Sequence, residues 1–80
     1  MKEKLKISIS MLINLQGELS GRYGVMLYPR NYYTPKVDPY FYFKQAPDNE
    51  IIDFIRKYFE SFGGEVKFTD KDKRFVVYQR

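Results

Sequence analysis

The chain of 80 residues contains no cysteine and no histidine. Without cysteine there can be no disulfide and no thiolate metal site, and without histidine the usual zinc ligand and general base are missing. No apolar run approaches the roughly 20 residues of a membrane-spanning helix. The first ten residues, MKEKLKISIS, lack the apolar region and cleavage site of a signal peptide. We therefore expect one intracellular, cytoplasmic domain over residues 1–80, without a membrane partner or a cofactor.

Positive charge is unevenly distributed along the chain. The net charge is +4, but residues 20–46 carry +3 and residues 63–80 carry +2, whereas residues 47–62 carry −2. The basic segments have the composition of strands and the acidic segment has that of a helix. A basic sheet backed by an acidic helix has the charge distribution of a nucleic-acid-binding surface, although many small basic domains are merely soluble.

Hydrophobic periodicity predicts an α+β fold. Residues 47–64, PDNEIIDFIRKYFESFGG, place apolar side chains at three- and four-residue spacing and end in two glycines, which predicts an amphipathic helix. Alternating and aromatic segments predict four strands, at residues 21–30, 37–45, 65–69 and 74–79. The last two strands flank the polar turn DKDK and should form a hairpin.

The opening segment is ambiguous. From Leu5 to Leu15 apolar residues alternate with others almost strictly, which favours a strand by local rules. A helix would instead gather Leu5, Ile9, Leu12 and Ile13 on one face. A helix gives the element order αββαββ, and a strand gives the alternative βββαββ.

Four tyrosines near the middle of the chain have two interpretations. Tyr32, Tyr33, Tyr40 and Tyr42 have the ring type that stacks on unpaired bases in single-strand-binding proteins. The alternative, which we favour from sequence alone, is that these rings cover the edge of a small core.

The order of elements resembles a family. Residues 39–79 combine an aromatic strand, an amphipathic helix, Gly-Gly and a basic hairpin, and residues 9–17 read ISMLINLQG. The chain thereby resembles a single, truncated and degenerate repeat of the LAGLIDADG homing endonucleases, whose repeat continues with a further helix. The resemblance implies an αββαββ domain with a four-stranded antiparallel saddle-shaped sheet and helices packed on one face.

The motif departs from the family at its chemical centre. Leu12, Ile13 and Gly17 match, but Met11 replaces a close-packed glycine and Gln16 stands where the family carries its metal-binding acid. A neutral amide is a poor ligand for Mg²⁺, so this register implies a protein without catalytic residues or a metal site. In an alternative register LQGEL becomes the motif's end and Glu18 its acid, but Leu12 and Ile13 then occupy positions that require small residues.

The resemblance also implies two interfaces. Motif helices of the family pair around a twofold axis, and the corresponding homodimer interface is Ile9, Leu12, Ile13 and Gln16. The family reads duplex DNA in the major groove with outward-facing strand residues. The candidates are Arg22, Arg30, Lys36, Lys44, Lys67, Lys71, Lys73 and Arg74, with Tyr23 and Tyr42 beside them. Lys71 and Lys73 suit phosphate contacts. For each of these cations the alternative interpretation is an ordinary solvated charge on the surface of a strand.

Three functions remain open from sequence. The leading hypothesis is a homodimeric, catalytically inactive protein that binds duplex DNA. The second is an active Mg²⁺-dependent DNA endonuclease that uses Glu18. The third is a small β-rich structural or interaction protein with no nucleic-acid role, which gains support if the opening segment is a strand.

Overall fold

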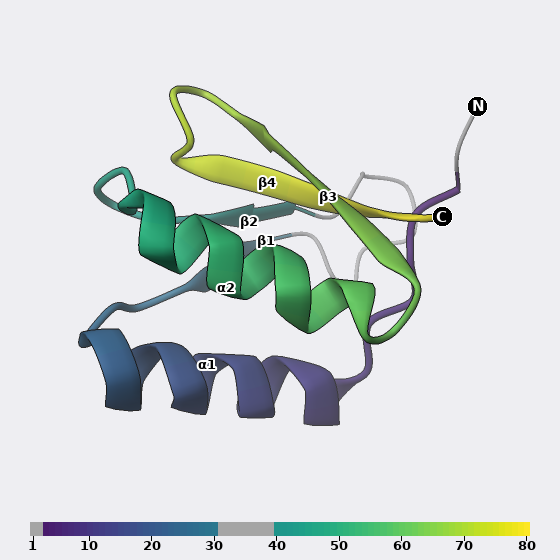
Figure 1. Cartoon of the computed structure of the whole chain (residues 1–80), viewed down its shortest axis with the longest axis horizontal. Helices are drawn as coiled ribbons and strands as arrows, with labels where there is room; N and C mark the ends of the chain where they lie inside the picture. The colour runs from purple at the N-terminus through teal and green to yellow at the C-terminus, as the bar shows by residue number, and fades with distance from the viewer. Residues whose placement is uncertain (1–2, 31–39) are drawn as a thin grey trace.

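A computed structural model describes residues 3–30 and 40–80. Two helices and four strands follow one another in the order αββαββ (Figure 1). They are α1 (Ile9–Tyr23), β1 (Tyr28–Arg30), β2 (Tyr40–Tyr42), α2 (Asn49–Glu60), β3 (Gly64–Thr69) and β4 (Arg74–Gln79). The α+β class and this order are as expected. The alternative order βββαββ is wrong, because residues 9–23 are helical.

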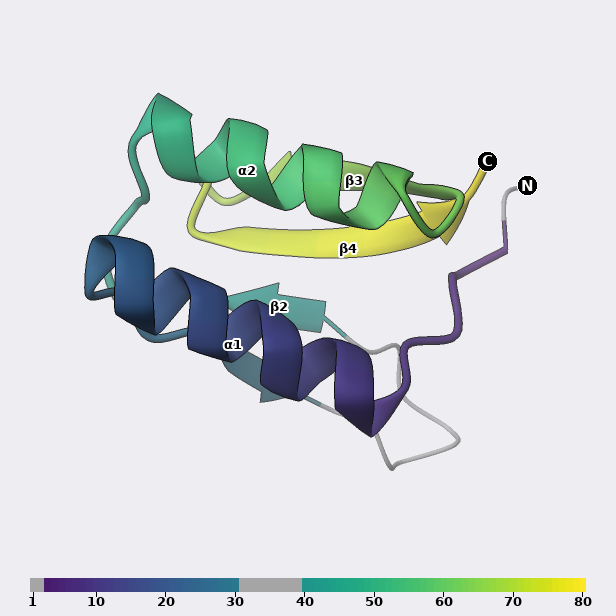
Figure 2. The ribbon, with the colours of Figure 1, turned by 60° about the horizontal axis from the view of Figure 1, so that its bottom comes forward.

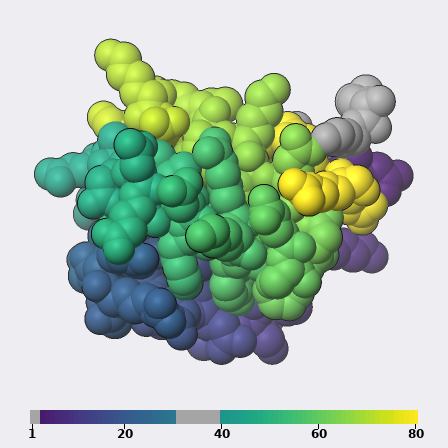
Figure 3. All heavy atoms as spheres, viewed as in Figure 1, coloured from purple at the N-terminus to yellow at the C-terminus, as the bar shows by residue number. Residues whose placement is uncertain are grey.

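The strands form one antiparallel sheet in the order β1-β2-β4-β3. Both helices lie on the same face of this sheet and run in opposite directions, with α2 over β3 and β4 and α1 over β1 and β2 (Figures 1 and 2). No helix or strand of the described residues covers the other face. Seen from the helix side, α1, α2 and the β3–β4 hairpin form one continuous surface (Figure 3).

The core lies between the helices and the sheet. It is built from buried apolar residues of α1, β2, α2 and β4, together with residues next to β1 and β2: Leu15, Leu19, Leu27, Phe41, Phe43, Ile51, Ile55, Phe59, Phe75 and Val77. Phe41 and Phe75 stack across neighbouring strands with ring centroids 4.9 Å apart. Large rings fill this core with few positions, as the aromatic content of the chain predicts.

The helical state of α1 overrides the alternating pattern of its sequence. Ser8 caps its N-terminus by accepting a hydrogen bond from the Met11 amide, and Gly24 ends it in the left-handed conformation at φ 64°. Leu15 and Leu19, one turn apart, are fully buried, whereas Ile9 and Ile13 of the alternating pattern are exposed. Local alternation therefore gave the wrong prediction because contacts with distant elements select the buried face.

The other sequence predictions differ mainly in their boundaries. The expected strand at 21–30 is wrong over most of its length, because residues 21–23 complete α1 and β1 has three residues. The strand expected at 37–45 is described as β2 over residues 40–42, and residues 37–39 lie outside the described residues. The helix and the final hairpin are confirmed, with Asp48 as the helix cap.

The segment before α1 keeps some strand character. The Leu5 amide donates to the Val77 carbonyl at 3.0 Å, and the Gln79 amide donates to the Glu3 carbonyl at 2.7 Å. Lys4 forms an isolated antiparallel bridge with Tyr78. The beginning of the chain is thus attached to the end of β4, which fixes the position from which α1 starts.

Candidate nucleic-acid interface

The uncovered face of the sheet carries the strand residues that alternate with the core residues. We call it the open face, and on the strands it consists of Tyr28, Arg30, Tyr40, Tyr42, Glu65, Lys67, Thr69, Arg74, Val76 and Tyr78. Tyr28 lies opposite Tyr42 in the register, and Tyr42 lies opposite Arg74. Aromatic and cationic side chains therefore sit side by side across the three strands β1, β2 and β4.

Each of three cations on this face lies over a tyrosine ring. The Arg74 guanidinium carbon is 4.4 Å from the centroid of Tyr40, and that of Arg30 is 5.4 Å from the centroid of Tyr42. Lys44, just after β2, places its ammonium nitrogen 5.3 Å from the centroid of Tyr28. These distances are within the range of cation–π attraction. The rings therefore hold positive charge in place along the open face.

Three aromatic rings and three cations border a hollow at the end of this face. Its volume is about 180 Å³, and it is lined by Arg30, Tyr40, Tyr42, Phe43, Asp70, Lys73 and Arg74. Arg30 also donates from Nη2 to the Tyr42 hydroxyl at 3.2 Å. A hollow of this size holds roughly six water molecules at about 30 Å³ each. Its lining combines flat aromatic surface with positive charge, and Asp70 is its one acidic residue.

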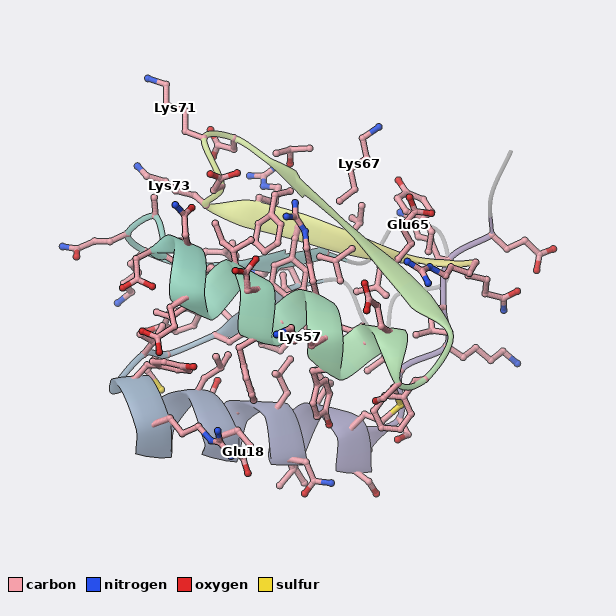
Figure 4. All side chains as sticks on the ribbon, viewed as in Figure 1. Glu18, Lys57, Glu65, Lys67, Lys71 and Lys73 are labelled. Atoms are coloured by element: carbon pink, nitrogen blue, oxygen red, sulfur yellow. The ribbon has the colours of Figure 1, made fainter. Side chains whose placement is uncertain are left out.

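The hairpin between β3 and β4 adds further lysines beside the open face. Lys67, Lys71 and Lys73 project from the hairpin, far from α1 (Figure 4). The turn places Asp70, Lys71 and Asp72 in the left-handed region, at φ 54°, 56° and 69°. The turn is thus tightly folded, and its exposed lysine side chains extend into solvent, as phosphate contacts would require.

Three predicted binding residues do not join this group: Arg22, Tyr23 and Lys36. Tyr23 is the last residue of α1 and packs edge-on against Phe54 of α2, with ring centroids 5.9 Å apart. Arg22 lies in the last turn of α1, on the helix side of the molecule, where its Nε donates to Glu18 Oε2 at 2.5 Å. Its guanidinium also lies over the ring of Phe54, 5.4 Å from the centroid. Arg22 was assigned to the interface because a strand was expected there. Lys36 lies outside the described residues.

The predicted dimer residues surround a second surface feature, on α1. An apolar hollow of about 510 Å³, the α1 groove, is lined by Leu12, Ile13, Gln16, Gly17, Ser20, Met26, Leu27 and Pro29. Ile13 and Met26 are 64% and 58% exposed, and Ile9 one turn earlier is 59% exposed. Three large apolar side chains thus face solvent near one another, which is typical of a contact surface.

Gln16 has a role within the chain that its sequence position did not indicate. Its Oε1 accepts a hydrogen bond from the Leu27 amide at 2.9 Å, and its Nε2 donates to the Val25 carbonyl at 3.4 Å. The side chain therefore attaches α1 to the segment that enters β1. The amide is used intramolecularly at the place where the resembled motif has a metal-binding acid.

Glu18 points to a different side of α1. Its carboxylate pairs with Arg22, whose guanidinium lies over Phe54 of α2, whereas Gln16 borders the α1 groove. In the described part of the chain, no three acidic side chains lie close enough together to hold a metal ion. The arrangement offers Glu18 a cationic partner and no second carboxylate.

Tyr58 connects the two helices. Its hydroxyl donates to the Met11 carbonyl at 2.8 Å. Burial, and secondarily the negative charge of Glu18, raise the pKa of the Tyr58 phenol above its usual value. The neutral, hydrogen-bonded phenol is therefore the form that the folded chain favours.

No family model matches the chain, and no curated protein or solved structure matches it. None of the helices in the described ranges is long and apolar enough to cross a membrane. The open face and the α1 groove are therefore the features of the chain that bear on its function.

Sequence reasoning found most of the cations of the open face but missed Tyr28. Tyr40, Tyr42 and Lys44 are two residues apart in the sequence, a spacing that predicts a shared face in a strand. Tyr28 joins them only through the pairing of β1 with β2, which is a long-range feature. The bonds of Gln16 likewise depend on where residues 25–27 pass.

Proposed function

We propose that the protein binds nucleic acid through the open face without cleaving it, and that two copies associate through the α1 groove. The observation that carries the proposal is the gathering of Arg30, Lys44 and Arg74 over tyrosine rings on the uncovered side of the sheet. Cations fixed in this way are suited to phosphates.

The charge distribution supports this orientation. The acidic segment 47–62, with a net charge of −2, contains α2 and lies behind the sheet. A polyanion is thus attracted to the open face and the hairpin, and repelled from the helix side. The β-rich alternative without a nucleic-acid role loses its main support, since the opening segment is a helix.

Self-association is supported by the exposed apolar side chains beside the α1 groove. The element order and the helices on one face agree with a LAGLIDADG-like, saddle-shaped domain, in which helices such as α1 pair. Ile9 and Ile13 would line the seam, and Leu12 would support it from its half-buried position. Gln16 would border the seam while its amide stays bonded to residues 25 and 27.

Binding is tested by its dependence on salt. Affinity for nucleic acid should fall steeply between about 50 and 200 mM salt, because each phosphate contact releases counterions. Lys73→Gln should weaken binding to all sequences alike and reduce the slope of log K against log salt by about 0.7–0.9. Lys57→Gln is the matched control, since Lys57 is an exposed lysine on α2 at the helix side. Equal effects of the two substitutions would contradict an interface on the open face.

The absence of cleavage is a separate expectation. Purified protein incubated with Mg²⁺ and supercoiled or linear duplex DNA should leave the DNA intact, because Gln16 is neutral and Glu18 is paired with Arg22. Glu18→Gln is the deciding comparison. Nicking by the wild-type protein that Glu18→Gln abolishes, with binding preserved, would establish the endonuclease alternative.

A further inference from the structure

The open face carries tyrosines where contacts with phosphates alone would require none. Tyr40 and Tyr42 lie on the side of the sheet opposite the core, so the expectation that they cover the core's edge does not describe them. Tyr32 and Tyr33 of the same expectation lie outside the described residues. Together with Tyr28, the rings of Tyr40 and Tyr42 form a row in which Tyr28 and Tyr42 stack on each other, with centroids 5.1 Å apart and planes 21° apart, and Tyr40 lies 6.4 Å from Tyr42. Aromatic side chains on an open four-stranded sheet are a known platform for two or three unpaired bases.

We infer that the ligand of the open face is single-stranded nucleic acid, whose unpaired bases stack on Tyr28, Tyr40 and Tyr42. The inference rests on the proposed function, because it names the form of nucleic acid that the same face binds. Stacking on tyrosine requires the flat face of a base, which every base has, so binding should depend little on sequence.

The cations are placed to serve the phosphates of such a strand. Arg74 and Arg30 reach diagonally across the strands to Tyr40 and Tyr42, so the two arginines flank these rings from opposite sides. Each guanidinium lies over one of these rings, so a base that takes that ring face displaces it sideways, where it can contact the base's phosphate or stack on the base in turn. Lys73 borders the same hollow, and Lys44 serves the Tyr28 end of the row.

A duplex fits this row poorly. Each base pair in a duplex has its flat faces covered by its neighbours, so the rings would find no base surface to stack on. The tyrosines of the interior strand β2 are therefore reached most easily by a single strand lying across the sheet.

The first test compares ligands of equal length on the full chain. Fluorescence anisotropy would be measured with labelled oligothymidylate and oligouridylate of about 12 nucleotides and with a duplex of the same length. We expect the single strands to bind at least about tenfold more tightly than the duplex. Because the chain has eight Tyr and no Trp, stacking should also quench its tyrosine fluorescence when the single strands bind.

The second test separates stacking from charge. Tyr40→Leu combined with Tyr42→Leu should weaken single-strand binding by at least about 30-fold, in line with the loss of stacking on two bases. Duplex binding should fall less, through the loosening of Arg30 and Arg74, which lie over these rings. Tyr40→Phe combined with Tyr42→Phe keeps both rings and should retain single-strand affinity. Circular dichroism would establish that both variants are folded.

The outcomes distinguish the two levels of the proposal. If neither single strands nor duplex bind at low salt, the proposed function itself fails. The inference of stacking is wrong if the duplex binds as tightly as the single strands. It is also wrong if the leucine variant binds single strands as tightly as the wild type does. In either case the face binds phosphates alone.

Discussion

The Gln16 side chain attaches α1 to the segment that enters β1. In the register that matches the family motif, it stands at the position of a metal-binding acid, and the described structure uses both ends of its amide to bond residues 25 and 27. A carboxylate at this position has no N–H group, so it could not donate a hydrogen bond to the Val25 carbonyl. The neutral residue is therefore explained by its local partners, which depend on where residues 25–27 pass in the folded chain.

Gln16→Ala should lower the free energy of unfolding by about 1–2 kcal/mol, because the Leu27 amide loses its half-buried acceptor. Urea denaturation followed by circular dichroism would measure the change. Gln16→Glu keeps the acceptor and loses the donor, so an intermediate effect is expected. Asn14→Ala, an exposed change on the same helix, should shift stability by less than about 0.5 kcal/mol. An effect of Gln16→Ala no larger than that of Asn14→Ala would rule out the attachment.

At the scale of elements, local pattern and final structure agree where one face is buried by neighbours close in sequence. The apolar stripe of α2 and the alternation of the β3–β4 hairpin predicted those elements well. The reason is that α2 and the hairpin, joined by the turn at Gly63, pack directly against each other. The state of α1 and the extent of β1 could not be predicted from local rules. The buried face of α1 is selected by α2 and the sheet, and β1 has three residues whose pairing depends on β2.

The same limits apply to the candidate site. Arg30, Lys44, Lys67 and Arg74 were predicted to share a face, and strand alternation places them together or next to one another. The prediction that Arg22 belongs to the strand face is wrong, because α1 continues to Tyr23 and ends at the Gly24 cap, where the sequence pattern predicts a strand. A helix-ending glycine after a run with a weak helical pattern is recognisable only when the helix itself is known.

The contact between α1 and α2 at Tyr58 predicts a dependence of stability on pH. The folded chain holds the phenol proton more tightly than the unfolded chain, so the contribution is fully present below the ordinary tyrosine pKa of about 10. It is lost as the pH rises through the raised pKa of the folded state. Tyr58→Phe should lower the free energy of unfolding by about 1 kcal/mol at neutral pH, through loss of the bond to Met11.

Urea unfolding of wild type and Tyr58→Phe at several alkaline pH values provides the measurement. The stability difference between the two proteins should shrink as the pH rises above about 10. A difference that stays constant over this range would mean that Tyr58 ionises equally in both states. Since the comparison is between two proteins with the same remaining tyrosines, the other phenols cancel to first order.

At the scale of the whole molecule, two surfaces with different chemistry lie on opposite sides. The open face and the hairpin are cationic and aromatic, whereas the helix layer presents the apolar α1 groove and the acidic α2. Pairing through the α1 groove would leave both open faces uncovered. Two linked faces bind a long strand more tightly than one, because the second contact becomes intramolecular.

Ile13→Glu is the sharpest test of that pairing. In the isolated chain the side chain is 64% exposed, so a glutamate there should change the stability of the monomer by less than about 0.5 kcal/mol. In a dimer the same glutamate would be buried without a partner, which is strongly unfavourable. Sedimentation of the wild type should show a dimer, and Ile13→Glu should sediment as a folded monomer.

Asn14→Glu adds the same charge one residue later, at an exposed position that does not line the α1 groove, and should leave the dimer intact. A wild-type protein that is monomeric at high concentration would overturn the pairing, while nucleic-acid binding by one open face would be unaffected. If both glutamate variants dissociate the dimer equally, the seam lies elsewhere on α1. Dissociation by Ile13→Glu alone would place the seam at the α1 groove and should also weaken binding to long single strands more than to short ones, since avidity is lost.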